Sequence, residues 1–243
     1  MEKEITEKRE KVKRGVEMIS VVVNGSETYR NAIESLKTQS YKDFEVVLVT
    51  DEKIDLSMFK NHKIITSPKY MEYVNGLKSS TYDKVVFLDG NDSFEKNKLD
   101  VVSKLDYDYL HNDYLDNSKF KHKNLPYLNM SCIGVNKSKY SNILTDLITK
   151  NKFYAYNLDN LLYWIGIENK YNILSIEEKL TRKLINNIPI EVYKNEWRAI
   201  ILELSYFKDK KVLKMIKSRR YSLEYYLRMH NIPVNSSPAV ISF

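Results

Sequence analysis

The chain has 243 residues, a formal net charge of +7 and 29% charged residues, so it can build one large core without disulfides or a second independent domain. Its one cysteine, Cys132, excludes an internal disulfide and lies in an apolar run, which predicts a buried thiol and a cytoplasmic protein. The sequence contains no apolar run of about 20 residues, P-loop, Gly-rich dinucleotide loop or Cys/His metal motif, which excludes a membrane-spanning helix and these sites. We expect residues 1–17 to form a charged arm, because they are too polar for a secretory signal.

Residues 18–50 follow a strand, helix, strand pattern. The apolar run at 18–23 is typical of a strand buried on both faces. Three small polar residues end that strand: Asn24, Gly25 and Ser26. We expect a helix over residues 27–38, because its apolar residues recur at helical spacing, and a second buried strand over 44–52.

The same alternation continues further along the chain. The pattern predicts a strand over residues 62–67, a helix over 70–80 and a fourth strand over 84–88. Strands that alternate with helices pair in parallel through right-handed crossovers. The sequence therefore predicts an α/β fold whose strands end at one common edge.

Polar side chains follow the fourth predicted strand in KVVFLDGND, residues 84–92. Asp89, Asn91 and Asp92 would lie at the carboxyl edge of the sheet, where open α/β folds bind ligands. Carboxylate and amide oxygens suit Mg²⁺ or Mn²⁺, which can hold a diphosphate. Asp51 follows the second strand and could share the same pocket. These residues predict a metal–nucleotide site, and a plain polar turn is the alternative.

Motifs at characteristic spacing resemble the family 2 glycosyltransferases of the GT-A fold. The motifs are SLKTQSYKDFEVVLVTDE at 35–52, Asn75-Gly76, Leu88-Asp89-Gly90-Asn91-Asp92 and KNKLDVVSKL at 96–105. The resemblance covers roughly residues 18–183. It implies a GT-A-like (Rossmann-like), mixed but mainly parallel sheet flanked by helices, and transfer of a sugar from a nucleotide-sugar donor.

The resemblance also implies roles for individual residues. Donor contacts fall to Asn24, Gly25, Ser26, Asp51, Asn75, Asp89 and Asn91. The divalent cation, Mn²⁺ or Mg²⁺, falls mainly to Asp92, with Asn91 near it. The chain departs from the family at Thr50 and Asn91, where the family has acids.

The second half carries further parts of the resemblance. Residues 128–140 resemble the acceptor-side strand, before a helix near 139–150, and 156–166 resemble the helix that bears the catalytic base. Asp159 occupies the place of that base, and a helix cap is the alternative. Arg182 lies in the late Leu-x-x-Arg element, where it would stabilise the departing diphosphate; a surface arginine is the alternative.

The C-terminal region is basic and is predicted to be helical. Residues 195–207 predict an apolar helix that packs on the body, and 208–230 predict a second helix. The latter segment contains eight Lys or Arg and two acids, a net charge of +6. Such a basic segment with tyrosines could lie on an anionic membrane, cover the core as a solvated helix, or bind nucleic acid.

The resemblance implies a GT-A-like domain over residues 18–190, with a nucleotide-sugar half at 18–105 and an acceptor half at 106–190, and the composition predicts a basic helical extension at 191–243. The expected activity is metal-dependent, inverting sugar transfer from a nucleotide sugar, best a UDP-sugar, to a glycan, lipid-linked or protein acceptor. The alternatives are a nucleotide-sugar binder with weak turnover and a basic nucleic-acid-binding protein that keeps the fold. The expected location is the cytoplasm, with the inner face of the membrane as one site of action.

Overall fold

The computed structural model describes residues 18–25, 29–116, 129–183, 190–232 and 234. The predicted arm at 1–17 and the predicted donor contact Ser26 lie outside the described residues. Within the described residues, no helix has the length and apolar character needed to cross a membrane.

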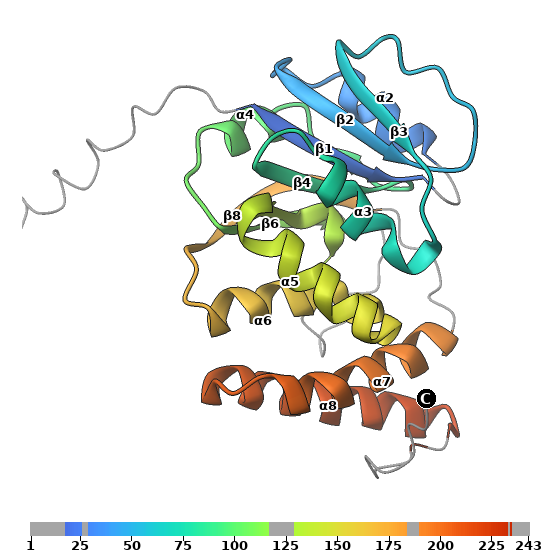
Figure 1. The fold of residues 1–243 in the computed structure, drawn as a ribbon, viewed down its shortest axis with the longest axis vertical. Coiled ribbons are helices and arrows are strands. Elements are labelled where there is room, and N and C mark those ends of the chain that lie inside the picture. Colours follow the sequence, from blue (N-terminus) through green and yellow to red (C-terminus); the bar gives the residue numbers. More distant parts are fainter. Residues whose placement is uncertain (1–17, 26–28, 117–128, 184–189, 233, 235–243) are drawn as a thin grey trace, which may run out of the picture.

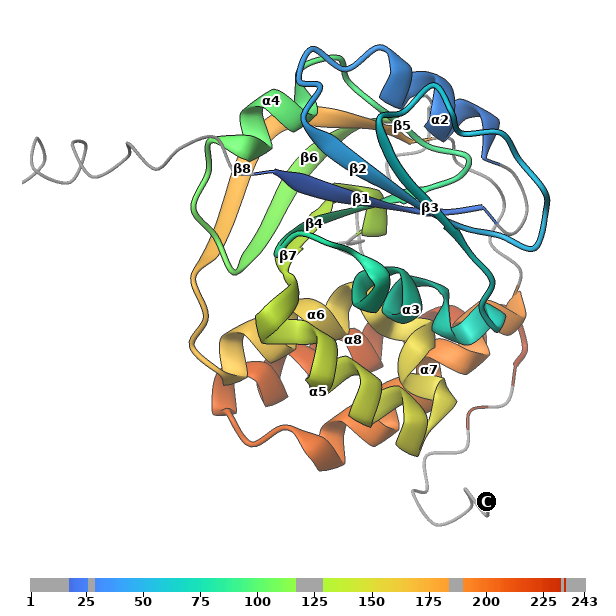
Figure 2. The same ribbon diagram turned by 45° about the horizontal axis from the view of Figure 1, so that its top comes forward.

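The centre of the fold is an eight-stranded mixed sheet with the order β3-β2-β1-β4-β7-β6-β8-β5 (Figures 1 and 2). The strands are β1 (Ile19–Asn24), β2 (Phe44–Val49), β3 (Asn61–Ile65), β4 (Lys84–Asp89), β5 (Ser93–Phe94), β6 (Tyr109–Asp116), β7 (Ile133–Asn136) and β8 (Ile173–Lys183). β3, β2, β1 and β4 are parallel, as predicted. β7 runs antiparallel to β4 and β6, β8 runs parallel to β6, and β5 runs antiparallel to β8.

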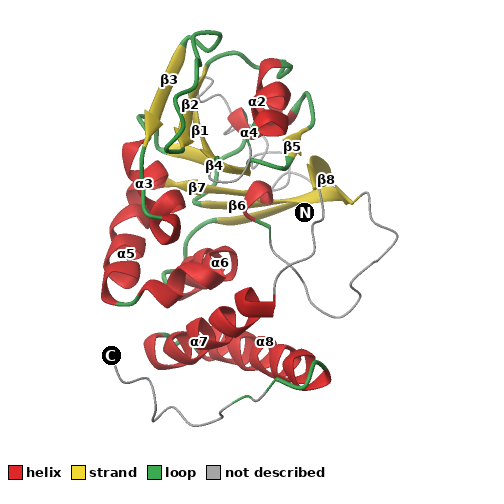
Figure 3. Cartoon of the chain, turned by 90° about the vertical axis from the view of Figure 1, so that its right-hand side faces the viewer, coloured by secondary structure: helices red, strands yellow, loops and turns green. Residues whose placement is uncertain are grey.

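Helices cover both faces of this sheet. The α-helices are α2 (Arg30–Lys37), α3 (Glu72–Ser79), α4 (Lys98–Ser103), α5 (Lys137–Lys150), α6 (Leu158–Glu168), α7 (Ile190–Tyr206) and α8 (Lys210–Met229). The described residues also form the short 3₁₀ helices η1 (Lys69–Met71), η2 (Met130–Cys132) and η3 (Lys152–Asn157). α2 and α4 lie on one face and α3, α5 and α6 on the other, while α7 and α8 form an outer layer beyond α5 and α6 (Figure 3).

Alternation along the strands explains the two covered faces. Val21 and Val23 of β1 belong to the cluster beneath α2 and α4, whereas Val22 belongs to the cluster beneath α3 and α5. Because successive side chains of a strand point to opposite faces, a strand covered on both sides reads as one apolar run. Gly76 allows α3 to lie close to β1, since a Cβ there would come within 2.3 Å of Val22 Cγ1.

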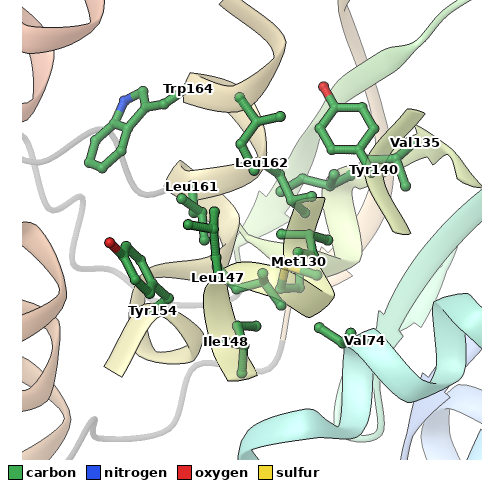
Figure 4. Close-up of a cluster of buried hydrophobic side chains, with 14 of the residues drawn as sticks. Val74, Met130, Val135, Tyr140, Leu147, Ile148, Tyr154, Leu161, Leu162 and Trp164 are labelled. Carbon is green, nitrogen blue, oxygen red and sulfur yellow. The ribbon is translucent and has the colours of Figure 1, made fainter. Parts of the chain in front are cut away.

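The larger cluster joins the sheet to the helices of the second half. Figure 4 shows Val74 of α3, Leu147 of α5 and Trp164 of α6 around it. Buried side chains of the outer helices extend the same cluster: Trp197, Ile200, Val212, Ile216, Leu223 and Leu227. α7 and α8 are therefore continuous with the hydrophobic core, and the predicted packing of residues 195–207 on the body is confirmed.

The predicted elements of the first half are confirmed with small shifts in their ends. The predicted strand in 128–140 is in fact η2, the four residues of β7 and the start of α5. β5 and β6 were not predicted. The segment at 177–183 proves to be the end of the long strand β8.

Candidate functional site

The candidate site lies at the carboxyl edge of the parallel strands. Asn24, the last residue of β1, pairs in register with Asp89, the last residue of β4. β2 lies on the other side of β1 and ends at Val49, so β1 separates Asp51 from Asp89. The side chain of Asp51 is exposed.

Asp89 is the central carboxylate of this edge. The hydroxyl of Tyr73 on α3 donates to its Oδ1, and the side chain of Asn24 reaches the same hydroxyl. Burial, and then the nearby charge of Asp92, raise the pKa of Asp89 to about 6, while Tyr73 and Lys183 oppose the rise. Tyr73 was not predicted, although its helix was, because its role depends on the packing of α3 against the sheet, where its ring meets that of Phe87 edge-on.

The side chain of Asp92 joins the turn after β4 to η2. It is 3% exposed, and its Oδ2 accepts hydrogen bonds from Ser131 Oγ at 2.7 Å and Asn129 Nδ2 at 3.2 Å. Ser131 Oγ in turn accepts from the backbone N–H of Asp89 at 2.9 Å. The carboxylate therefore fastens η2 beneath the end of β4.

A buried lysine extends this hydrogen-bond network from Ser131 to β8. Lys98 of α4 is 1% exposed and donates to the carbonyl of Ser131 at 2.5 Å and to Thr181 Oγ1 at 2.8 Å. Burial lowers the pKa of Lys98 to about 7, and Cys132 and Asp92 counteract the shift. Cys132 is buried, as predicted. Nothing in the spacing of the sequence marks Lys98 as buried, because a lysine in a charged helix is usually solvated.

Asp159 lies in the first turn of α6, as predicted. Its Oδ1 accepts from the backbone N–H of Asn160 at 2.8 Å, so it takes part in capping the helix. Burial, and then the charge of Glu196, raise the pKa of Asp159 to about 6, while Arg219 and Lys183 oppose the rise. The charge of Asp159 also raises the pKa of Asp89, which places the start of α6 in electrostatic reach of the end of β4.

Buried polar side chains of α7 and α8 are linked to the residues next to Asp159. Arg219 of α8 donates through Nε to Glu196 Oε1 of α7 at 2.7 Å, and both side chains are 6% exposed. Glu203 of α7 accepts two hydrogen bonds from Asn157 at 2.9 and 3.1 Å. Asn157 Oδ1 in turn accepts from Asn160 at 2.8 Å. A polar network therefore joins α7 and α8 to the first turn of α6.

Two neighbouring cations at the end of β8 have different surroundings. Arg182 Nη2 lies 3.1 Å from Glu95 Oε1, in a partly exposed ion pair. The charge of Lys183 lowers the pKa of both Asp89 and Asp159, so it lies in reach of both carboxylates. The motif predicts Arg182 as the partner of the diphosphate, and this role stays a prediction. Lys183, the next residue of β8, was not predicted.

The other predicted donor contacts lie around the same edge. Asn75 Nδ2 donates to Ser67 Oγ at 2.8 Å, after the end of β3. The Gly25 N–H donates to the carbonyl of Val49 at 3.0 Å. Asn91 is partly buried in the turn, and its carbonyl accepts from Asn31 Nδ2 at 3.4 Å.

The carboxylates of this edge differ from a preformed metal cluster. Among the described residues, no group of three or more His, Cys, Asp or Glu could hold a metal ion. Asp89 and Asp92 are nevertheless close enough for the charge of one to raise the pKa of the other, a repulsion that a cation would relieve. Mg²⁺ is commonly held by one or two carboxylates together with substrate phosphates and water. Asp89, Asn91 and Asp92 carry oxygen donors of the kind that such an ion prefers, and the metal site stays a prediction.

A separate hollow lies at the opposite edge of the sheet. It is lined by residues near the starts of β1 and β4, among them Met18, Asp83 and Lys84. It contains none of the carboxylates described above, so it is not the candidate site.

No protein-family model and no curated protein sequence matches the chain. Solved structures do: S. aureus TarS superposes with a TM-score of 0.61 at 16% identity, over 88% of this chain and 44% of that one. TarS 1–349 in complex with UDP gives 0.59 at 14% identity, over 84% and 72%. Its complex with UDP-GlcNAc gives 0.58 at 15% identity, over 84% and 73%. The chain thus spans less than half of the first TarS chain.

These likenesses concern the fold. TarS is a glycosyltransferase, and the mixed sheet with helices on both faces is consistent with a GT-A-like arrangement, so the predicted fold class is confirmed. At this level of identity the matches do not assign the chain to family 2.

Proposed function

We propose that this protein is a metal-dependent, inverting glycosyltransferase that moves a sugar from a UDP-sugar to a hydroxyl acceptor. The observation that best supports the proposal is that, in a fold shared with a glycosyltransferase, the charges of Asp159 and Lys183 act on the buried carboxylate Asp89 at the end of β4. TarS, which shares the fold, has been solved with UDP and with UDP-GlcNAc, which supports a nucleotide-sugar donor.

Asp159 is the proposed base. A carboxylate with a pKa of about 6 is ionised near neutral pH and still accepts a proton readily. It would take the proton of the acceptor hydroxyl as that oxygen bonds to the anomeric carbon. The bond from this carbon to the diphosphate oxygen breaks in the same displacement, which inverts the configuration and requires no protein nucleophile.

Lys183 is the proposed cationic partner of the departing diphosphate. Its charge acts on both carboxylates of the site, and its Nζ also lies 5.9 Å from the centroid of the Tyr114 ring. A divalent cation held by Asp92, Asn91 and Asp89 would supply Lewis-acid stabilisation of the phosphates. Tyr73 and Asn24 would orient Asp89 toward the donor.

The donor nucleotide would lie along the ends of β1 and β2. Gly25 brings the backbone close to Val49, and Asp51 follows on the exposed side of that edge. Asn75 fixes Ser67 at the next loop. These groups would contact the base and ribose.

A panel of nucleotide sugars tests the proposal. We expect UDP-sugars with Mn²⁺ to raise the melting temperature, since a ligand at 100 times its dissociation constant adds about 2.7 kcal/mol to the free energy of unfolding. We also expect release of UDP from the stabilising donor when the cation is present. Stabilisation without any UDP release or transfer would identify a binder instead, and no response to any donor would refute the proposal.

A further inference from the structure

The outer face of α8 combines basic and apolar side chains in an unusual way. Nine residues of the helix are exposed: Lys210, Lys211, Lys214, Lys217, Ser218, Tyr221, Tyr225, Arg228 and Met229. Five of these are basic and none is acidic. The single acid of the helix, Glu224, is partly buried and lies 2.5 Å from Arg228. The face is therefore strongly positive.

The apolar members of this face form one ridge. Tyr221, Tyr225 and Met229 are 70%, 69% and 66% exposed, and residues four apart lie above one another on a helix. The core needs none of them, because α8 buries a separate stripe that includes Val212, Ile216 and Leu223. α8 is thus a helix with one apolar stripe in the core and a second in solvent.

α8 lies in the outer layer of the molecule, so the ridge is exposed along the helix. α7 and α8 form the layer farthest from β1, β2 and β3 (Figures 1 and 3). The 20 residues of α8 span about 30 Å. A flat surface could contact the helix along its whole length.

We propose that this face of α8 docks on an anionic lipid bilayer, with the helix parallel to the membrane plane. Lysines attract anionic head groups, and tyrosine and methionine enter the boundary between head groups and acyl chains. Tyrosine suits this boundary because its ring is apolar and its hydroxyl is polar. Single-stranded nucleic acid, by contrast, is held in basic grooves lined by aromatic side chains, and the ridge lies on the convex side of one helix.

Vesicle flotation of the full chain tests the docking. We expect binding to vesicles of phosphatidylglycerol and phosphatidylcholine in equal parts, and much weaker binding to phosphatidylcholine alone. Replacing Lys210, Lys211, Lys214 and Lys217 with glutamine should lower the partition coefficient about fivefold per lysine, hence by several hundredfold together. Tyr221→Ser with Tyr225→Ser should also weaken binding, because it removes the ridge and keeps the charge.

A matched control separates the face from net charge. Lys60, Lys78, Lys96 and Lys150 are exposed outside α8, so their replacement with glutamine removes the same charge. This variant should bind like the parent, and circular dichroism should show that all three variants are folded. Equal losses in the control and the α8 variant, or no binding by the parent, would overturn the proposal. Binding of a single-stranded oligonucleotide, lost in the α8 variants while vesicles are ignored, would overturn it in favour of nucleic acid.

Discussion

At the scale of single residues, Asp159 combines a cap-like hydrogen bond with the position expected of the base. We predict that Asp159→Asn lowers turnover by about 10² or more with little change in donor affinity, because the amide cannot accept the proton. The amide oxygen can still accept from the Asn160 N–H, so the fold should persist. Single-turnover transfer and donor titration on one preparation measure both quantities.

The exposed carboxylate Asp113 supplies the control, since Asp113→Asn changes charge on β6 without touching α6. Parental turnover in Asp159→Asn would make Asp159 a capping residue. Glu168 would then be a poor substitute, because it already accepts from the backbone N–H of Asp209 at 2.9 Å.

The raised pKa of Asp159 gives a second prediction. Below about pH 6 the carboxylate is protonated and cannot act as a base, so kcat/KM should fall about tenfold per pH unit on the acid side. Above that value the carboxylate is ionised and the limb should level off. A pH–rate profile of the free enzyme measures this limb, and an acid limb near pH 4 would show that burial does not perturb the group.

Asn91 offers a cleaner test of the metal than Asp92. Asp92→Asn would weaken the bonds to Ser131 and Asn129, so its loss of donor binding could reflect the fold. We predict that Asn91→Asp tightens Mn²⁺-dependent donor binding, because it adds a charged oxygen at an accessible position of the turn. Calorimetric titration with Mn²⁺ and with chelator measures it, and unchanged or weaker binding in Asn91→Asp would remove Asn91 from the ligands.

At the scale of elements, the ion pair between Glu196 and Arg219 joins α7 to α8 and supports α6. We predict that Arg219→Met lowers the free energy of unfolding by about 3–5 kcal/mol, because it leaves a buried carboxylate without its partner. The double variant Glu196→Gln, Arg219→Met should be more stable than Arg219→Met alone. Urea denaturation of the single and double variants measures the coupling, and additive losses would show that the pair is not coupled.

The same ion pair tunes the proposed base. The charge of Glu196 raises the pKa of Asp159, so Glu196→Gln should move the acid limb of kcat/KM to lower pH. If Glu196 had a purely structural role, Glu196→Gln would lower the maximal kcat/KM and leave the pH of the acid limb unchanged.

The elements also show what the sequence could and could not predict. Apolar runs predicted β1, β2 and β4 because strands covered on both faces carry no polar alternation. β6 was missed because its polar sequence, YLHNDYLD, contains Asn112, which is fully buried and bonded to Thr181. Tyr73, Lys98 and Lys183 were missed for a related reason, since their roles depend on partners that are distant in the chain.

At the scale of the whole molecule, buried carboxylates set the response of stability to pH. The pKa values of Asp89, Asp159, Glu196 and Glu203 are all raised, chiefly by burial. Between about pH 5 and 7 the folded state therefore binds more protons than the unfolded state at these groups. His111 and Lys98, whose pKa values are lowered by burial, act in the opposite direction, His111 within this interval and Lys98 above about pH 7.

Because four carboxylates outweigh one histidine in this interval, we predict that the free energy of unfolding falls from about pH 5 to pH 7, by on the order of 2 kcal/mol. The sign follows from the raised values: the stability that protonation provides is lost as the pH rises through the folded-state pKa. Urea denaturation at the two pH values measures it. Asp159→Asn should reduce the difference, since one titrating group is removed, and Glu178→Gln, at an exposed position of β8, should leave it unchanged. Constant or rising stability over this interval would mean that these carboxylates titrate alike in the folded and unfolded states, and the electrostatic coupling that joins Asp89 to Asp159 would lose its basis.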